Sequence, residues 1–190
     1  MSGSLVLGGV HIRAGTTQVV ELPLPRLYTH TPVLLSVRVL RGRRDGPTLF
    51  VSAAVHGDEI NGVEIIRRLL RASALEGLRG PLIAVPVVNV YGFVRMSRYL
   101  PDRRDLNRCF PGSEKGSLAA RLAKTLVDEI VANADYGIDL HTGAVHRENL
   151  PQIRASLDVS ADVERLAMAF GSPVILNADL RDGSLRAAAQ

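Results

Sequence analysis

An apolar run that breaks off into a polar turn is the feature that most constrains the fold of this chain. Residues 48–55 read TLFVSAAV and are followed at once by HGDEING, after which a helix-like repeat begins. A continuous apolar run of this length suits a strand that is buried on both faces of a mainly parallel sheet. The carboxyl end of such a strand is where an open α/β sheet presents side chains to a ligand. We therefore expect the chemistry of the chain to lie at this turn.

The segments around the turn predict an α/β domain. Apolar residues at helical spacing follow the turn as far as Arg71, and a second buried strand is expected over residues 81–89. Residues 90–116 are expected to form a long, ordered loop, and residues 143–160 a polar segment. The remaining expected elements are short strands within residues 5–40, for which antiparallel pairing is one option, a helix from Ser117, a strand over 136–143, a helix over 162–170, a strand over 173–178 and a capped helix start at Ser184.

The composition is that of a globular domain and narrows the class of function. Of the 190 residues, 46% are hydrophobic and 22% are charged, and no apolar stretch is long enough to span a membrane. A single cysteine, Cys109, gives neither an internal disulfide nor a cysteine-based zinc site, which fits a cytoplasmic protein. The 23 basic and 19 acidic residues leave a net charge of only +4, and the basic clusters are short. A nucleic-acid-binding surface is therefore not favoured.

Two polar residues in the turn have the spacing of metal ligands. His56 and Glu59 lie three residues apart directly after the buried strand, and His141 follows another apolar strand. Two histidines and one carboxylate around an open fourth position make up a catalytic zinc site. The alternative for such a His–Glu pair is a polar pair on the surface. The position of the three residues at strand ends favours the metal site.

Three motifs, in this order, resemble those of a known family: HGDEING at residues 56–62, DLNR at 105–108 and DLHTG at 139–143. They are similar to the motifs of the succinylglutamate desuccinylase and aspartoacylase family, which consists of zinc amidohydrolases related in fold to the zinc carboxypeptidases. The resemblance covers about residues 30–190. It implies an α/β fold with a mixed, mainly parallel central sheet flanked by helices.

The resemblance also implies roles for six residues. His56, Glu59 and His141 would bind zinc (Zn), the expected cofactor. Asn107 and Arg108 would hold the carboxylate of the substrate, and Arg98 would polarise the scissile carbonyl. A guanidinium suits such an anchor because it offers a planar fork to a carboxylate and stays charged.

Two of the neighbouring side chains have alternative readings. Arg108 could instead stabilise its loop through an ion pair with Asp102 or Asp105. Asp139 could orient a ligand histidine from behind, or it could simply cap its loop. Both alternatives stay open on the sequence alone.

These features predict a zinc-dependent deacylase that uses a zinc-bound water to cleave the amide bond of an N-acyl amino acid or a similar small carboxylate. The alternatives are a metallocarboxypeptidase that acts on peptides and a non-catalytic basic module that binds nucleic acid. The expected partner is a small N-acyl amino acid-like substrate, without nucleic acid or membrane, and self-association into a homo-oligomer is left open.

The family resemblance further implies a general-base glutamate on a late strand and an additional C-terminal β domain. After His141 the chain offers only Glu148, in a polar loop, and Glu164, in an expected surface helix. We therefore expect residues 1–190 to form a single zinc-hydrolase catalytic domain that is truncated before its last strands. The C-terminal β domain is expected to be absent, and weak or no activity is expected because loss of a general base typically costs about 10²–10⁴-fold in rate.

Overall fold

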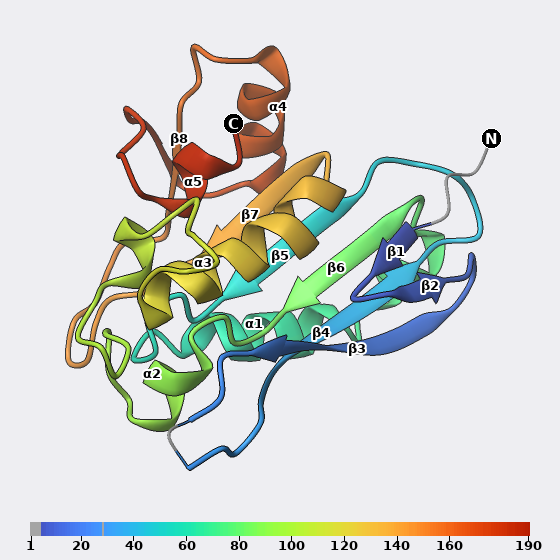
Figure 1. Ribbon diagram of the computed structural model, residues 1–190. Coiled ribbons are helices and arrows are strands. Elements are labelled where there is room, and N and C mark those ends of the chain that lie inside the picture. Colours follow the sequence, from blue (N-terminus) through green and yellow to red (C-terminus); the bar gives the residue numbers. More distant parts are fainter. Residues whose placement is uncertain (1–4, 28) are drawn as a thin grey trace.

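The computed structural model describes residues 5–27 and 29–190, and its centre is a five-stranded sheet flanked by helices (Figure 1). In chain order the elements are β1 (Leu5–Leu7), β2 (Val10–Ile12), β3 (Thr17–Leu24), β4 (Val33–Arg41), β5 (Leu49–Ala53), α1 (Asn61–Leu69), the 3₁₀ helix η1 (Ser73–Gly77), β6 (Pro81–Val85), α2 (Val90–Val94), the 3₁₀ helix η2 (Leu106–Arg108), α3 (Leu118–Glu129), the 3₁₀ helix η3 (Val131–Asn133), β7 (Tyr136–Leu140), β8 (Gln152–Ala155), α4 (Ala161–Phe170), β9 (Val174–Asn177) and α5 (Leu185–Ala188).

The central sheet has the strand order β3-β4-β6-β5-β7. Its β3–β4 and β4–β6 pairings are antiparallel, whereas β5 pairs in parallel with β6 on one side and with β7 on the other. The predicted mixed α/β fold is confirmed. The parallel part of the sheet holds the strand of the opening apolar run, and β5 and β7 therefore end at the same edge.

Hydrophobic cores cover both faces of the sheet. Alternate side chains of a strand point to opposite faces, so Phe50 packs in the larger core with Leu126 of α3. Val51 and Ala53 lie in the smaller core with Ile66 of α1. Strand β5 is thus covered by helices on both faces, as its continuous apolar sequence predicts (Figure 1).

Two segments differ from the expectation. Residues 90–116 are not a loop throughout, because they contain the short helices α2 and η2. The start of α2 is capped by Asn89, whose side-chain oxygen accepts a hydrogen bond from Gly92 N at 2.8 Å. Helix propensities do not predict this five-residue helix, because it contains a glycine. The polar segment before residue 160 contains β8, which is short and mostly half-exposed and so lacks an apolar pattern.

The C-terminal part forms a small unit beside the edge of β7. Strands β8 and β9 pair in parallel, and α4 connects them. Tyr136 of β7 lies close to this unit, with its hydroxyl 3.2 Å from Asp162 Oδ2 of α4. In the described ranges, no helix combines the length and the apolar character needed to cross a membrane.

Candidate metal centre

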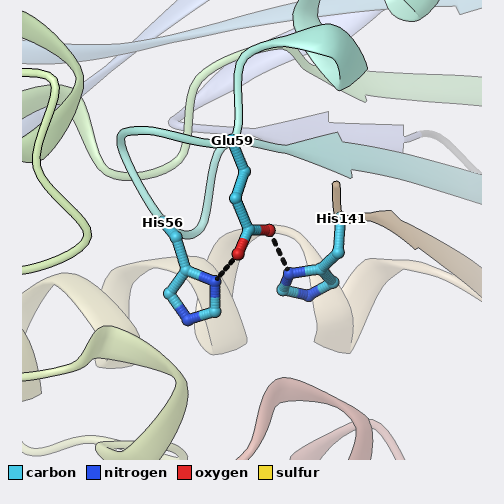
Figure 2. A group of neighbouring side chains, drawn as sticks. All are labelled: His56, Glu59 and His141. Atoms are coloured by element: carbon cyan, nitrogen blue, oxygen red, sulfur yellow. Dashed lines mark hydrogen bonds and ion pairs between the residues drawn. The ribbon is translucent and has the colours of Figure 1, made fainter. Parts of the chain in front are cut away.

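The carboxyl ends of β5 and β7 bring the predicted ligands together. His56 and Glu59 lie in the turn between β5 and α1, and His141 directly follows β7. Because the two strands are neighbours and run in parallel, residues that follow them meet at one edge of the sheet. The three side chains converge there, with the carboxylate of Glu59 between the two imidazole rings (Figure 2).

The donor atoms of this cluster are close enough to share one metal ion. Nδ1 of His56 lies 2.7 Å from Glu59 Oε1, and Nδ1 of His141 lies 2.8 Å from Glu59 Oε2 (Figure 2). One candidate ligand atom from each residue lies within 4.8 Å of the other two. His56 and Glu59 are buried, with 4% of each residue exposed, whereas 36% of the His141 side chain is exposed. The site is therefore anchored in the protein and open on one side.

The outward-facing nitrogen of each ring is held by a carboxylate. Nε2 of His56 lies 3.1 Å from Asp105 Oδ1, and Nε2 of His141 lies 2.7 Å from Asp139 Oδ2. Histidine ligands of metals usually donate their second N–H to a carboxylate or a carbonyl, which fixes the ring and its tautomer. Two imidazoles and one carboxylate with such outer partners fit a zinc ion in their chemistry.

Charge interactions stabilise the cluster in its metal-free form. Burial disfavours the ionised Glu59, but the hydrogen bonds from His141 and His56 outweigh it and lower the pKa of Glu59 to about 2. Burial likewise disfavours a charged His141, but the negative charge and hydrogen bond of Asp139, together with Glu59, raise the pKa of His141 to about 10. The site is therefore built for a positive charge between the carboxylates, which a metal cation would also provide.

The turn that carries His56 and Glu59 depends on close backbone packing. Ala54, directly after β5, has a φ of 51° and so adopts the left-handed conformation that turns the chain. A Cβ on Gly57 would lie 2.1 Å from the carbonyl carbon of Gly92, so only glycine fits there. In the sequence, the glycine itself indicates the packing constraint at residue 57. Nothing in the sequence indicates the left-handed conformation of Ala54.

Arg98 lies beside the ligands. Its Nη2 and Nε atoms donate to Asp105 Oδ2 at 2.9 and 3.2 Å, and its Nη1 donates to Glu59 Oε1 at 3.4 Å. Its side chain is 31% exposed, so the guanidinium is held by the cluster and still reaches solvent. The structure therefore brings Arg98 next to the candidate metal ligands.

Asn107 and Arg108 lie in η2, in the connection between β6 and α3 that also carries Arg98. The side-chain oxygen of Asn107 accepts a hydrogen bond from Leu185 N at 2.9 Å, at the start of α5. Its amide nitrogen makes no hydrogen bond within the described residues and can donate to a carboxylate. Arg108 is exposed, and its guanidinium donates to the backbone oxygen of Asn107.

The alternative ion pairs of Arg108 are not formed in the described part of the chain. Asp102 accepts hydrogen bonds from Arg104 N and Ala119 N and so caps the start of α3. Asp105 contacts His56 and Arg98 instead, a role that the sequence reasoning missed. The only signal for it was its place in the DLNR motif. For Asp139 the structure favours the first of the two readings, because its carboxylate contacts the ring of His141.

Comparisons with known proteins agree with this geometry. A sequence model described as the succinylglutamate desuccinylase/aspartoacylase catalytic domain matches residues 45–190. An N-alpha-acetyl-L-2,4-diaminobutyric acid deacetylase of Halomonas elongata is 31% identical over 146 residues, which are 74% of this chain and 42% of that protein.

Two solved structures extend the comparison to the fold. A succinylglutamate desuccinylase/aspartoacylase from Rhodobacter sphaeroides has a TM-score of 0.77 at 30% identity, over 86% of this chain and 51% of its own. The product-bound ectoine utilization protein EutE (DoeB) from Ruegeria pomeroyi has a TM-score of 0.77 at 26% identity, over 93% and 56%. The chain thus spans about half the length of these relatives.

Proposed function

Because the chain belongs to the succinylglutamate desuccinylase/aspartoacylase family, we propose that it is a zinc-dependent deacylase that cleaves the amide bond of an N-acyl amino acid or a similar small carboxylate. The observation that carries this proposal is the convergence of His56, Glu59 and His141 at the edge of the sheet. Family membership supports the deacylase class, and the nitrogen and oxygen donor set supports zinc.

His56, Glu59 and His141 would hold the zinc ion in this proposal. A bound zinc ion lowers the pKa of a water molecule to about 7 and can polarise a carbonyl oxygen. Asp105 and Asp139 accept the outward N–H groups of the two rings, so that Nδ1 of each ring stays turned toward the site. The chain itself therefore supplies both the ligands and the groups that orient them.

Three further side chains would bind and orient the substrate. Arg98 lies within hydrogen-bond reach of Glu59, and in this proposal its guanidinium would donate to the carbonyl of the scissile amide. Arg108 is exposed and not engaged by either aspartate, so its planar fork is available to a substrate carboxylate, with the amide nitrogen of Asn107 beside it. The relative from Halomonas elongata is named for an N-acetylated amino acid, which supports this class of substrate.

The two glutamates that follow His141 are poorly placed to transfer a proton in the site. Glu148 and Glu164 are both exposed, and neither contacts the ligand cluster. We therefore propose that residues 1–190 bind the metal but turn substrate over about 10²–10⁴-fold more slowly than a site that has a general base. Turnover as fast as that of the Halomonas elongata deacetylase, measured side by side, would contradict this part of the proposal.

Elemental analysis of the purified protein tests the metal. One zinc ion per chain is expected, and His56→Ala and His141→Ala should each lose it because a three-ligand site cannot keep its affinity with two. His146→Ala is the matched control, since this exposed histidine lies five residues beyond His141 and should leave the zinc content unchanged. A folded protein without affinity for any divalent metal would refute the proposal.

A substrate panel separates the deacylase from a metallocarboxypeptidase. N-acetyl and N-succinyl amino acids are compared with peptides of two to four residues, and released amine is measured at equal zinc loading. Preferential release from the acyl amino acids is expected. Preferential cleavage at peptide C-termini would favour the carboxypeptidase, which uses the same anchor chemistry.

A further inference from the structure

Strand β5 is apolar except for one fully buried serine, and this serine is a candidate for an additional functional role. Ser52 lies in β5 between Val51 and Ala53, and no part of it reaches solvent. A buried hydroxyl needs a hydrogen-bond partner, because leaving it unpaired is costly. The hydroxyl of Ser52 donates to Oδ1 of Asp139 at 2.7 Å. The serine thus points at the carboxylate behind the candidate metal site.

The register of the sheet sets this contact. Ser52 and Asp139 are directly opposed in the parallel pairing of β5 and β7. Asp139 and His141 are two residues apart on the same segment, so both side chains lie on one side of it. The second oxygen of Asp139 lies 2.7 Å from His141 Nε2, and His141 Nδ1 in turn lies 2.8 Å from Glu59. A continuous row of contacts therefore runs from the strand interior to the ligands.

The two carboxylates behind the histidines are supported unequally. Asp105, behind His56, also accepts hydrogen bonds from Arg98 and from the backbone nitrogen of Asn107. Within the described residues, Asp139 has no partners other than Ser52 and His141. The terminal torsion of an aspartate is soft, so a carboxylate held at one oxygen alone can rotate. The orientation of Asp139 therefore depends on the serine.

We propose that Ser52 is a positioning residue for the metal centre, acting through Asp139 on His141. This proposal rests on the proposed function, in which His141 is a zinc ligand. An ionised carboxylate only accepts hydrogen bonds, so Asp139 keeps the ring proton on Nε2 and leaves Nδ1 for the metal. His141 is the more exposed of the two histidines, with 36% of its side chain accessible against 4% for His56. Its ring is therefore the one that needs support from behind.

Zinc affinity tests the proposal, measured by competition with a chromophoric chelator. Ser52→Ala removes the hydroxyl with little change in volume and should weaken zinc binding by about tenfold, at the lower end of the range for partners of metal ligands. Ser52→Thr keeps a hydroxyl and should retain more of the affinity. Ser156→Ala is the matched control, because that hydroxyl donates to Ala178 O at 2.9 Å in the β8–β9 unit. It should leave zinc affinity unchanged.

A second readout separates positioning from stability. In ¹H–¹⁵N spectra of the histidine rings, the Nε2–H signal of His141 should be visible in the unchanged protein and lost to solvent exchange in Ser52→Ala. This measurement also works without metal, so it tests the serine even if the unchanged protein binds no zinc, a result that would refute the proposed function instead. If Ser52→Ala does not fold, Ser52→Cys replaces it, because a thiol fills the same space but is a weak donor.

The proposal would be overturned by a folded Ser52→Ala protein with zinc affinity within twofold of the unchanged chain. Equal losses of affinity in Ser52→Ala and Ser156→Ala would overturn it as well, since they would show a general effect of the lost hydroxyl. An unaltered Nε2–H signal of His141 in metal-free Ser52→Ala would also overturn the proposal, because it would show that Asp139 holds the His141 ring without the serine.

Discussion

Replacement of Asp105 by alanine tests how far the metal centre depends on the loop that precedes α3. The carboxylate of Asp105 accepts from three groups: the Nε2 of His56, the guanidinium of Arg98 and the backbone nitrogen of Asn107. Its side chain is only 16% exposed. Asp105→Ala removes all of these contacts at once and leaves the outward nitrogen of His56 without a partner.

The expected loss of stability follows from how much water can replace each contact. His56 is 4% exposed, so its unpaired nitrogen costs about 1–3 kcal/mol. The lost cap on Asn107 N adds about 1 kcal/mol. Arg98 is 31% exposed and can turn to solvent, so its share is at most about 1 kcal/mol. We expect a loss of about 2–4 kcal/mol in the free energy of unfolding, because neighbouring contacts do not add fully.

Urea unfolding of the metal-free protein measures this loss, and chelator competition measures zinc affinity. Zinc binding should weaken about 10–100-fold in Asp105→Ala, because His56 is no longer oriented. Asp102→Ala is the matched control in the same loop, since Asp102 caps Ala119 N without touching the ligands. It should lose about 1 kcal/mol of stability and no zinc affinity. Equal zinc affinity in the two variants would refute the reasoning.

Three further substitutions distinguish binding from structural roles near the site. Asn107→Ala should lower the free energy of unfolding by about 1 kcal/mol, because its oxygen caps Leu185 N at the start of α5; urea unfolding measures it. Arg108→Ala should change stability by less than about 0.5 kcal/mol, because Arg108 is exposed, but should raise KM for an acyl amino acid at least about tenfold in steady-state assays. An unchanged KM would argue against the anchor role. Gly57→Ala should lose about 2–3 kcal/mol in urea unfolding, because its Cβ would overlap the backbone of Gly92.

The convergence of His56, Glu59 and His141 was predictable because each of them follows a strand that the sequence shows as an apolar run. His56 and Glu59 follow residues 48–55, and His141 follows the short strand that begins at Tyr136. Strand ends in a parallel arrangement meet at one edge, so three residues that are up to 85 positions apart in the numbering could be assigned to one site. Local pattern and general sheet geometry were sufficient for this step.

The contacts of the connection between β6 and α3 were not predictable in the same way. Its path depends on tertiary contacts such as the bond from the Asn89 side chain to Arg98 O at 3.4 Å, which helps to hold the loop that carries Arg98. The choice of partner for Asp105 depends on that path, since Arg108 is nearer in sequence but Arg98 and His56 are its partners in space. For this reason sequence spacing alone left open an ion pair between Arg108 and Asp105, which the described residues do not form.

The support behind His141 shows which additional information was needed. Ser52 can be matched with Asp139 only once β5 and β7 are known to be neighbours, although β6 lies between them in the chain. A shift of one residue in their register would turn Asp139 and His141 to the opposite face and away from the serine. The candidate metal centre therefore depends on strand register on the His141 side and on loop conformation on the His56 side. Substitutions in the sheet should act through His141, and substitutions in the loop should act through His56.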